Sequence, residues 1–191
     1  MTQSIFTDLL IKGEIIEDLR PNLYDPVEGT TIADAEVKRI TRKTKLAHIR
    51  WTLEDGNEII ISTTRPELIC ACGVILVHPE DNRYRDLIGR NVSLPINVEG
   101  RSDKVKILSH PSVKMDFGSG VLMVCSYGDQ NDVSVFRELK LEPFQAIDLE
   151  GRMTEVAGPL EGMLVLDARL AALDMLSADG RLEGLEEREQ E

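Results

Sequence analysis

Short apolar runs separated by turn-forming residues fill the middle of the chain, and they restrict the fold more than any other feature. Ala47, Ile49, Trp51 and Leu53 alternate with polar residues, and the turn sequence EDGN then leads into EIIIS, which predicts a β-hairpin. Similar runs follow at GVILVH (73–78), NVSLPINV (91–98), KVKILS (104–109), GVLMVCS (120–126) and FQAIDL (144–149). Runs of this length and spacing are typical of an all-β barrel or sandwich.

Three segments have the spacing of helices instead. The first, SIFTDLLIKG, ends at Gly13, and the last, LVLDARLAALDML, ends before Gly180. The middle one, DQNDVSVFRELK, begins at Asp129, a candidate N-cap. Residues 14–40 contain prolines and glycine, so we expect an extended excursion there. The chain is therefore predicted to be mainly β with α decoration and to form a single domain over residues 1–191.

The composition supports a globular protein that works in water. In a chain of 191 residues, 42% are hydrophobic and 29% charged, which is enough for a sizeable core. No apolar run approaches the roughly 20 residues that a membrane helix needs, and the N-terminal sequence lacks the basic start and long apolar stretch of a signal peptide. We expect a cytoplasmic protein with no membrane partner.

Charge is distributed unevenly along the chain. The formal net charge is -12, and residues 183–191 hold five acidic residues and one arginine. A basic cluster lies between positions 38 and 50 and consists of Lys38, Arg39, Arg42, Lys43, Lys45 and Arg50. This cluster suits two interpretations: a surface that faces phosphates, or alternate solvent-facing positions of a strand pair.

The cysteines and histidines do not form a metal-binding pattern. Cys70, Cys72 and Cys125 do not have zinc or redox spacing, so we interpret them as small core residues. The histidines are isolated from one another and from the cysteines. We expect no metal and no cofactor.

Two hydroxyls stand where an apolar strand ends. Thr63 and Thr64 follow Ile59, Ile60 and Ile61, in the stretch ISTTRPEL. Such hydroxyls and the N–H groups that follow them can hold a water molecule or a developing negative oxygen. The alternative is that Thr64 caps the short helix that Pro66 is expected to begin.

A second candidate site lies in FGSGVLMVCSYGDQND, residues 117–132. Gly118 and Gly120 flank Ser119 just before a strand and permit a close backbone approach. Asp129 and Asp132 follow that strand in the first turn of a helix. They can act in a site or merely stabilise the start of the helix. In a barrel, the strand exits that carry the threonines and the aspartates can converge.

These motifs together resemble a known family. TTRPEL, GVILVHPEDNRY, FGSGVLMVCSYGDQNDV and EGMLVLDARLAAL, in this order, are similar to the editing (CP1) domain inserted in class I aminoacyl-tRNA synthetases, over about residues 13–184. The form TTRPEL is most like the valyl type. The resemblance implies a closed β-barrel of the valyl/isoleucyl/leucyl-tRNA synthetase editing-domain type.

The resemblance also implies a function within a larger enzyme. The expected reaction is hydrolysis of the ester in mischarged threonyl-tRNA(Val), and the expected partners are the 3′ end of tRNA(Val) and the catalytic core of the parent synthetase. No HIGH-like or KMSKS-like stretch occurs, so the aminoacylation site is expected outside this chain. Residues 1–35 and 180–191 would then connect to the missing core, and we expect a monomer.

Roles for individual residues follow from the same resemblance. Asp132 matches the aspartate that holds the ammonium group of the substrate. We expect Asp132, Thr63 and Thr64 to be the catalytic residues. Asp129 and Thr63 are expected partners of the threonine hydroxyl and the attacking water. Arg65 would lie near the ester or the terminal phosphate.

The remaining assignments concern the walls of the substrate site. Phe117 would stack on the terminal adenine. Met123 and Cys125 occupy positions where some valyl members have lysine and threonine, Ser119 a position where threonine is common, and Gly128 one where histidine occurs. The pocket is therefore expected to offer fewer polar contacts.

Three other functions remain open from the sequence. The chain can be an editing domain of the isoleucyl or leucyl type, or a module that binds the tRNA 3′ end without catalysis. It can also be an unrelated barrel that binds a small molecule, if the ordered motifs are a coincidence.

Overall fold

The computed structural model describes residues 2–17, 21–38, 40–96 and 102–190. Its main body is a curved seven-stranded sheet in the order β4-β3-β6-β7-β5-β8, with β9 paired to β3 outside that path. The strands are β3 (Arg42–Leu53), β4 (Glu58–Thr63), β5 (Cys72–Val77), β6 (Asn91–Ser93), β7 (Lys104–Ser109), β8 (Val121–Cys125) and β9 (Leu182–Gln190). All of these pairs are antiparallel except β5 with β7.

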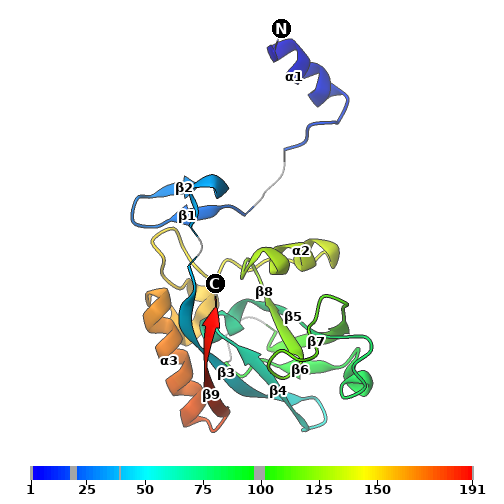
Figure 1. Cartoon of the computed structure of the whole chain (residues 1–191), viewed down its shortest axis with the longest axis vertical. Helices are drawn as coiled ribbons and strands as arrows, with labels where there is room; N and C mark the ends of the chain where they lie inside the picture. Colours follow the sequence, from blue (N-terminus) through cyan, green and yellow to red (C-terminus); the bar gives the residue numbers. More distant parts are fainter. Residues whose placement is uncertain (1, 18–20, 39, 97–101, 191) are drawn as a thin grey trace.

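The sheet curls until its two ends meet. β4 and β8 stand at opposite ends of the strand order, yet residues of the two strands are in contact (Figure 1). The result is a nearly closed β-barrel, so the predicted fold class is confirmed. The strand β3 spans the barrel and turns tightly into β4 at Gly56, whose positive φ of 83° suits glycine.

Alternation along β3 fills the barrel. Ala47, Ile49, Trp51 and Leu53 are buried, whereas the residues between them are only partly covered. Their partners on β4, including Ile59 and Ile61, are buried on the same face. Cys70, Cys72 and Cys125 join this core, which confirms their interpretation as core residues.

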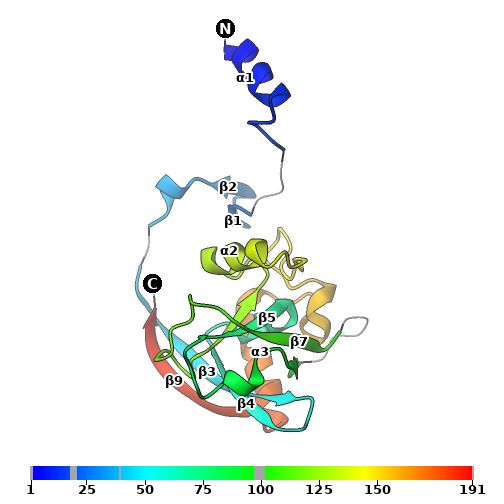
Figure 2. The same ribbon diagram turned by 90° about the vertical axis from the view of Figure 1, so that its right-hand side faces the viewer.

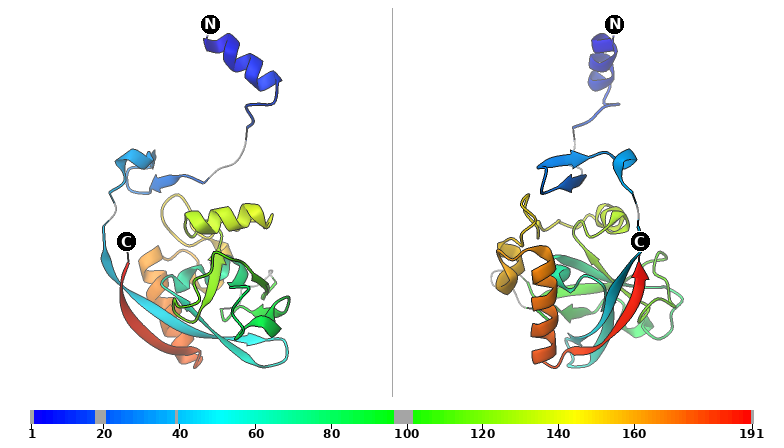
Figure 3. Two further views of the ribbon diagram at one scale, coloured as in Figure 1. Left: turned by 45° about the vertical axis from the view of Figure 1, so that its right-hand side comes forward. Right: turned by 60° about the vertical axis from the view of Figure 1, so that its left-hand side comes forward.

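The helices are α1 (Thr2–Ile11), α2 (Gln130–Glu138) and α3 (Val165–Ala178), with short 3-10 turns η1 (Asp34–Glu36), η2 (Pro66–Ala71), η3 (Arg85–Leu87) and η4 (Glu155–Leu160). Of the three helices, α2 and α3 cover the outside of the barrel. In Figure 3, α2 lies across one end of the barrel and α3 runs along its side. The helix α3 buries Ala168, Ala172 and Leu176 in the main core, whereas α2 closes a second cluster with Val135 and Phe136. All three helices occur where the sequence predicts them.

The N-terminal region extends away from the barrel. No residue of α1 is buried, and Figure 2 shows it far from the sheet. The antiparallel pair β1 (Leu23–Asp25) and β2 (Thr30–Ile32) lies between them, in agreement with the predicted extended excursion. Within the part of the chain that is described, no helix combines the length and apolar character needed to cross a membrane.

Two predicted strands differ in the structure. FQAIDL is not a strand, because only Ile147 forms a single bridge, to Met153, and the N–H of Phe144 donates to the side chain of Ser126 at 2.7 Å. NVSLPINV is a strand only over Asn91–Ser93, and its last two residues lie outside the described ranges.

The acidic C-terminal segment forms a strand that the sequence did not indicate. β9 pairs with β3 so that Glu189 stands opposite Lys43 and Glu187 opposite Lys45. The basic and acidic clusters are therefore neighbours in one strand pair. Arg39 lies outside the described residues.

Candidate functional site

The hydroxyls of the TTRP motif stand at the junction of a strand and a turn. β4 ends at Thr63, and η2 begins at Pro66. The Thr63 Oγ1 accepts a hydrogen bond from the N–H of Arg65 at 3.1 Å, which fixes the turn. The expected alternative, a cap formed by Thr64, is wrong, because Arg65 is the N-cap residue of η2 and no side chain caps it.

The two aspartates are connected at the start of α2. Asp129 is the N-cap, and its Oδ1 accepts from the N–H of Asp132 at 2.9 Å, as the sequence predicts. The Oδ2 of Asp132 accepts from the N–H of Cys125 at 3.2 Å. Gly128 makes room for this carboxylate, because a Cβ at position 128 would lie 2.2 Å from the Asp132 Oδ2.

Arg65 joins the two motifs. Its Nη1 donates to the carbonyl oxygen of Gly128 at 2.9 Å, across 63 positions of sequence. The guanidinium is therefore beside the start of α2, where it acts on the charge of Asp132. The structure thus brings Arg65, Asp129 and Asp132 together, in contact with the turn that holds Thr63.

Asp132 is an unusual acid. Its residue surface is only 9% exposed. Burial and the neighbouring Asp129 carboxylate raise the pKa of Asp132 to about 7, while the N–H of Cys125 and the charge of Arg65 act in the opposite direction. Near neutral pH, this carboxyl group therefore changes its charge with small changes in its surroundings.

Arg65 also contacts an ion pair between Glu67 and Arg169, which was not predicted from the sequence. Glu67 is fully buried and accepts from Arg65 Nε at 3.3 Å. Arg169 of α3 donates to both oxygens of the same carboxylate, at 3.0 Å and 2.7 Å. The only signal in the sequence is the presence of charged residues inside two largely apolar segments, Glu67 in PELICA and Asp167 and Arg169 in VLDARLAAL.

Phe117 packs against Arg188 of β9, and not against Arg65, Asp129 or Asp132. It is 46% exposed, and the guanidinium of Arg188 stands 4.4 Å from the centre of its ring. The same loop is attached to the outer face of β4, since the N–H of Ser119 donates to Ser62 Oγ at 3.2 Å and His48 Nδ1 lies 2.8 Å from that oxygen. Ser62 and Thr63 point to opposite faces of their strand.

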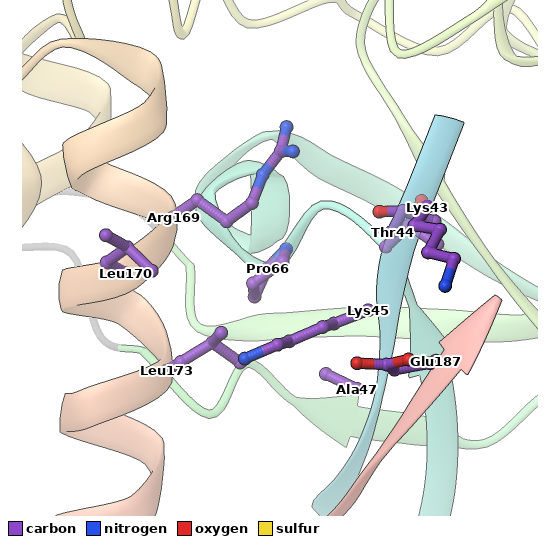
Figure 4. A pocket seen from close by; sticks show the side chains of 10 residues that line it. Lys43, Thr44, Lys45, Ala47, Pro66, Arg169, Leu170, Leu173 and Glu187 are labelled. Carbon is purple, nitrogen blue, oxygen red and sulfur yellow. The ribbon is translucent and has the colours of Figure 1, made fainter. Parts of the chain in front are cut away.

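The other predicted site residues are placed as follows. Met123 and Cys125 are buried in the main core, where the thiol of Cys125 donates to the carbonyl oxygen of Leu68 at 3.3 Å. Thr64 lines a cleft of about 260 Å³ between α3 and β3, which does not include Asp132 among its lining residues (Figure 4). Over the described residues, no group of three or more histidine, cysteine or acidic side chains is arranged to hold a metal ion.

Comparisons with known proteins identify relatives of this chain. No family model matches the chain. The valine–tRNA ligase of Aeropyrum pernix is 42% identical over 183 residues, which are 95% of this chain and 22% of that protein. The valine–tRNA ligases of Thermoplasma acidophilum and Nanoarchaeum equitans are 40% and 39% identical and cover 95% and 98% of this chain. The chain therefore spans only about a fifth to a quarter of the length of these relatives, 22% to 24%.

A solved structure supports the fold. The crystal structure of GlLeuRS-CP1, from a leucyl-tRNA synthetase, superposes with a TM-score of 0.59 and 12% sequence identity. The match covers 75% of this chain and 99% of that one. At this identity the likeness concerns the arrangement of the barrel alone.

Proposed function

The chain belongs to the editing (CP1) domains of class I aminoacyl-tRNA synthetases and is most like the valyl enzymes. We propose that its site hydrolyses mischarged threonyl-tRNA(Val). The observation that carries the proposal is the hydrogen bond from Arg65 to Gly128. It joins the turn after β4 to the aspartates of α2, two motifs that are far apart in sequence. The proposed partners are the 3′ end of tRNA(Val) and the catalytic core of the parent synthetase.

Asp132 would bind the ammonium group of the esterified amino acid. An ionised carboxylate forms a strong, charge-assisted hydrogen bond with such a cation, which orients the ester. The approach of a positive charge also favours ionisation of a carboxyl group whose pKa is about 7. Binding of the substrate would therefore set the charge state that the site needs.

The reaction itself is the addition of water to an ester. Water attacks the carbonyl carbon, the bond to the ribose oxygen breaks, and the leaving oxygen takes up a proton, which yields free threonine and the 3′ end of the tRNA. The hydroxyl of Thr63 accepts from the N–H of Arg65, so its own hydrogen can be donated to the developing negative oxygen. The guanidinium of Arg65 would stabilise the same charge.

Selection of threonine over valine requires polar groups that bind the extra hydroxyl. A hydrophobic pocket rejects a hydroxylated isostere only weakly, and the valyl enzyme facing threonine is the standard worked example of this limit. In the editing site, Asp129 and Thr63 would bind the hydroxyl, and bound valine would leave them without that partner. Met123 and Cys125 would contribute only apolar surface.

The test is a comparison of two esters on the same RNA. The chain is incubated with threonyl-tRNA(Val) and valyl-tRNA(Val), and release of each amino acid is followed over time. We expect faster release of threonine, loss of release in Asp132→Ala, and unchanged release in the control Asp174→Asn, which alters an exposed acid of α3. Equal rates for both esters would contradict the valyl assignment.

A second candidate function is capture of the tRNA 3′ end without hydrolysis. It is favoured by the burial of Met123 and Cys125, which supply no charged or strongly polar group to a reacting ester. In the same assay, salt-sensitive binding of the tRNA with no release of either amino acid would support this alternative.

A further inference from the structure

Arg65 is held at two of its three guanidinium nitrogens. Its Nε donates to Glu67 Oε1 at 3.3 Å, and its Nη1 donates to the carbonyl oxygen of Gly128 at 2.9 Å. Among the described residues none accepts from Nη2, and the side chain is 35% exposed. Two fixed nitrogens determine the plane of the guanidinium, so the third nitrogen is presented to the surface in one direction.

The carboxylate that holds Arg65 is itself oriented from α3. Arg169 Nε donates to Glu67 Oε2 at 3.0 Å, and Arg169 Nη2 donates to Oε1 at 2.7 Å. A bidentate contact of this kind fixes the plane of the carboxylate. In Figure 4, the side chain of Arg169 extends from α3 toward the turn that carries Pro66. The oxygen that accepts from Arg65 is therefore held in place by a residue of another element.

The backbone of Arg65 is fixed, and only its side chain remains to be oriented. The N–H of Arg65 donates to Thr63 Oγ1 at 3.1 Å, and its carbonyl oxygen accepts from the N–H of Leu68 at 3.0 Å. An arginine side chain has many rotamers, so a fixed backbone does not determine where the guanidinium lies. The contact with Glu67 restricts these rotamers.

Glu67 and Arg169 have no direct part in the chemistry of the site. Glu67 has no exposed surface, so neither water nor an ester reaches its carboxylate, and Arg169 uses two of its nitrogens to hold that carboxylate. We infer that Glu67 and Arg169 are positioning residues for the proposed hydrolysis, because they hold the guanidinium of Arg65 with Nη2 left for the substrate. The inference rests on the proposed function and adds two residues to it.

The charges of the three groups favour the same role. A carboxylate paired with Arg65 alone would largely cancel the positive charge that faces the site. Arg169 supplies a second positive charge to Glu67, so the group as a whole keeps one net positive charge. Arg65 can then stabilise the negative oxygen that develops when water adds to the ester. Arg169 thus both orients the carboxylate and offsets its charge.

A tether that only stabilises the fold is the competing explanation. Glu67 belongs to η2 and Arg169 to α3, so their contact connects two elements. A tether does not need charge, because replacement of a buried ion pair by apolar residues of similar volume is often neutral or stabilising. It also makes no use of the bond between Glu67 and Arg65. The two explanations therefore differ in what an apolar pair at these positions should do.

The test variant is Glu67→Met/Arg169→Met in the full chain. Methionine resembles both side chains in length, so the variant should keep η2 packed on α3 and melt close to the unaltered chain, while Arg65 loses its bond at Nε. We expect kcat for threonyl-tRNA(Val) to fall about 10- to 100-fold with little change in KM, because a misplacement of about 1 Å can cost about 100-fold. The matched control Glu54→Gln/Lys104→Gln removes an exposed pair separated by 3.6 Å and should leave kcat unchanged.

Arg169→Lys provides a second and milder variant. Lysine keeps the positive charge beside Glu67 and should preserve the fold, but its single nitrogen does not fix the plane of the carboxylate. We expect kcat to fall by a smaller factor than in the test variant. A kcat equal to that of the unaltered chain would contradict a positioning role.

Action through Arg65 is tested in a second background. Arg65→Met removes the guanidinium and should lower kcat at least as much as the test variant does. If Glu67 and Arg169 act through Arg65, the triple variant Arg65→Met/Glu67→Met/Arg169→Met should be no slower than Arg65→Met alone. A tether with an effect of its own would add a further loss.

A third measurement needs no ester. Burial and the Asp129 carboxylate raise the pKa of Asp132 to about 7, and the charge of Arg65 opposes them. Displacement of the guanidinium in Glu67→Met/Arg169→Met should therefore raise this pKa further, whereas the net charge of the chain stays the same. NMR titration of the Asp132 carboxyl carbon in the chain without RNA measures the change, and the control variant should show none.

Specific results would overturn the inference and leave the proposed function intact. They are an unchanged kcat in the folded test variant, or a further loss of kcat in the triple variant, in a chain that otherwise releases threonine. If the unaltered chain released neither amino acid, the proposed function would fail, and the pKa of Asp132 alone would decide. A raised pKa in the test variant would still support positioning of Arg65 by this pair, and an unchanged pKa would refute it.

Discussion

The carboxyl group of Asp132 lies where two influences oppose its ionisation. It is buried at the start of α2, and Asp129 places a second carboxylate beside it. Two partners, the N–H of Cys125 and the charge of Arg65, offset only part of this effect, so the pKa of Asp132 is raised from 3.8 to about 7. In its ionised form, a group held in this way destabilises the fold.

The stability of the protein should therefore depend on the charge of Asp132. The folded pKa is higher than the unfolded one, so the stability associated with this group is fully present below about pH 4 and is lost as the pH rises through about 7. Asp132→Asn keeps the shape and removes the charge. We expect the variant to be more stable than the unaltered chain at pH 8, by an amount on the order of a few kcal/mol, and no more stable at pH 4.

Denaturant unfolding at both pH values measures this difference. The control is Asp174→Asn, an exposed carboxyl group of α3 that should leave the difference between the two pH values unchanged. An Asp132→Asn variant that loses stability at pH 8 would show that hydrogen bonding by the carboxylate outweighs its desolvation.

At the scale of elements, one ion pair connects the turn of the TTRP motif to α3. Glu67 of η2 has no exposed surface, and Arg169 of α3 approaches both of its oxygens. Arg65 contacts the same carboxylate and also reaches the start of α2. The carboxyl group of Glu67 thus connects η2 to α3 and also holds Arg65, whose guanidinium reaches the start of α2.

Removal of either partner should destabilise the fold strongly. A buried ion pair that loses one member leaves an uncompensated charge, at a cost of about 3 to 5 kcal/mol. Arg65 still contacts Glu67 when Arg169 is replaced, and the side chain of Arg169 is 30% exposed. We therefore expect Arg169→Met and Glu67→Gln each to lower the free energy of unfolding by at most this amount, and the double variant by less than the sum. Urea unfolding of the four proteins gives the coupling energy.

The exposed pair of Lys104 and Glu54, separated by 3.6 Å, provides the comparison. The same cycle there should yield about 0 to 1 kcal/mol. A coupling energy of that size between Glu67 and Arg169 would mean that the buried pair does not hold η2 against α3.

At the scale of the whole molecule, local patterns of sequence account for most of the barrel. The hairpin of β3 and β4 can be predicted from the sequence, because Ala47, Ile49 and Trp51 alternate with polar residues and a glycine turn follows. The strand β9 cannot be predicted from the sequence, because LEGLEEREQ has no apolar alternation and becomes a strand only by pairing with β3. FQAIDL is the opposite case, an apolar run that lacks a continuous partner strand.

For the candidate site too, some features can be predicted from the sequence and others cannot. Thr63, Asp129 and Asp132 can be predicted as candidate site residues from the sequence, because these polar residues follow apolar strands or begin a helix, whereas Arg65 was assigned from the family resemblance. The contact of Glu67 with Arg169 spans 102 positions, and nothing local encodes it. The room that Gly128 leaves for Asp132 likewise appears only when the chain is folded.

The N-terminal helix should be dispensable for the stability of the barrel. The apolar side chains of Ile5, Phe6 and Ile11 in α1 are 54%, 54% and 79% exposed, and no residue of this helix is buried. Burial of apolar surface is the main source of stability, so a helix that buries none contributes almost nothing. Deletion of residues 1–17 should leave the melting temperature within about 2 °C of the full chain, because a shift of 2 to 4 °C corresponds to roughly 1 kcal/mol at this size. Deletion of residues 182–191 is the contrasting variant, since it removes β9, uncovers the edge of β3 and should lower the melting temperature clearly.

The exposed apolar residues of α1 should also promote self-association, which sedimentation of the full and shortened chains at high concentration would detect. A fall of more than about 5 °C on removal of α1 alone would show that this helix docks on the barrel in solution, and its apolar side chains would then have a partner within the chain.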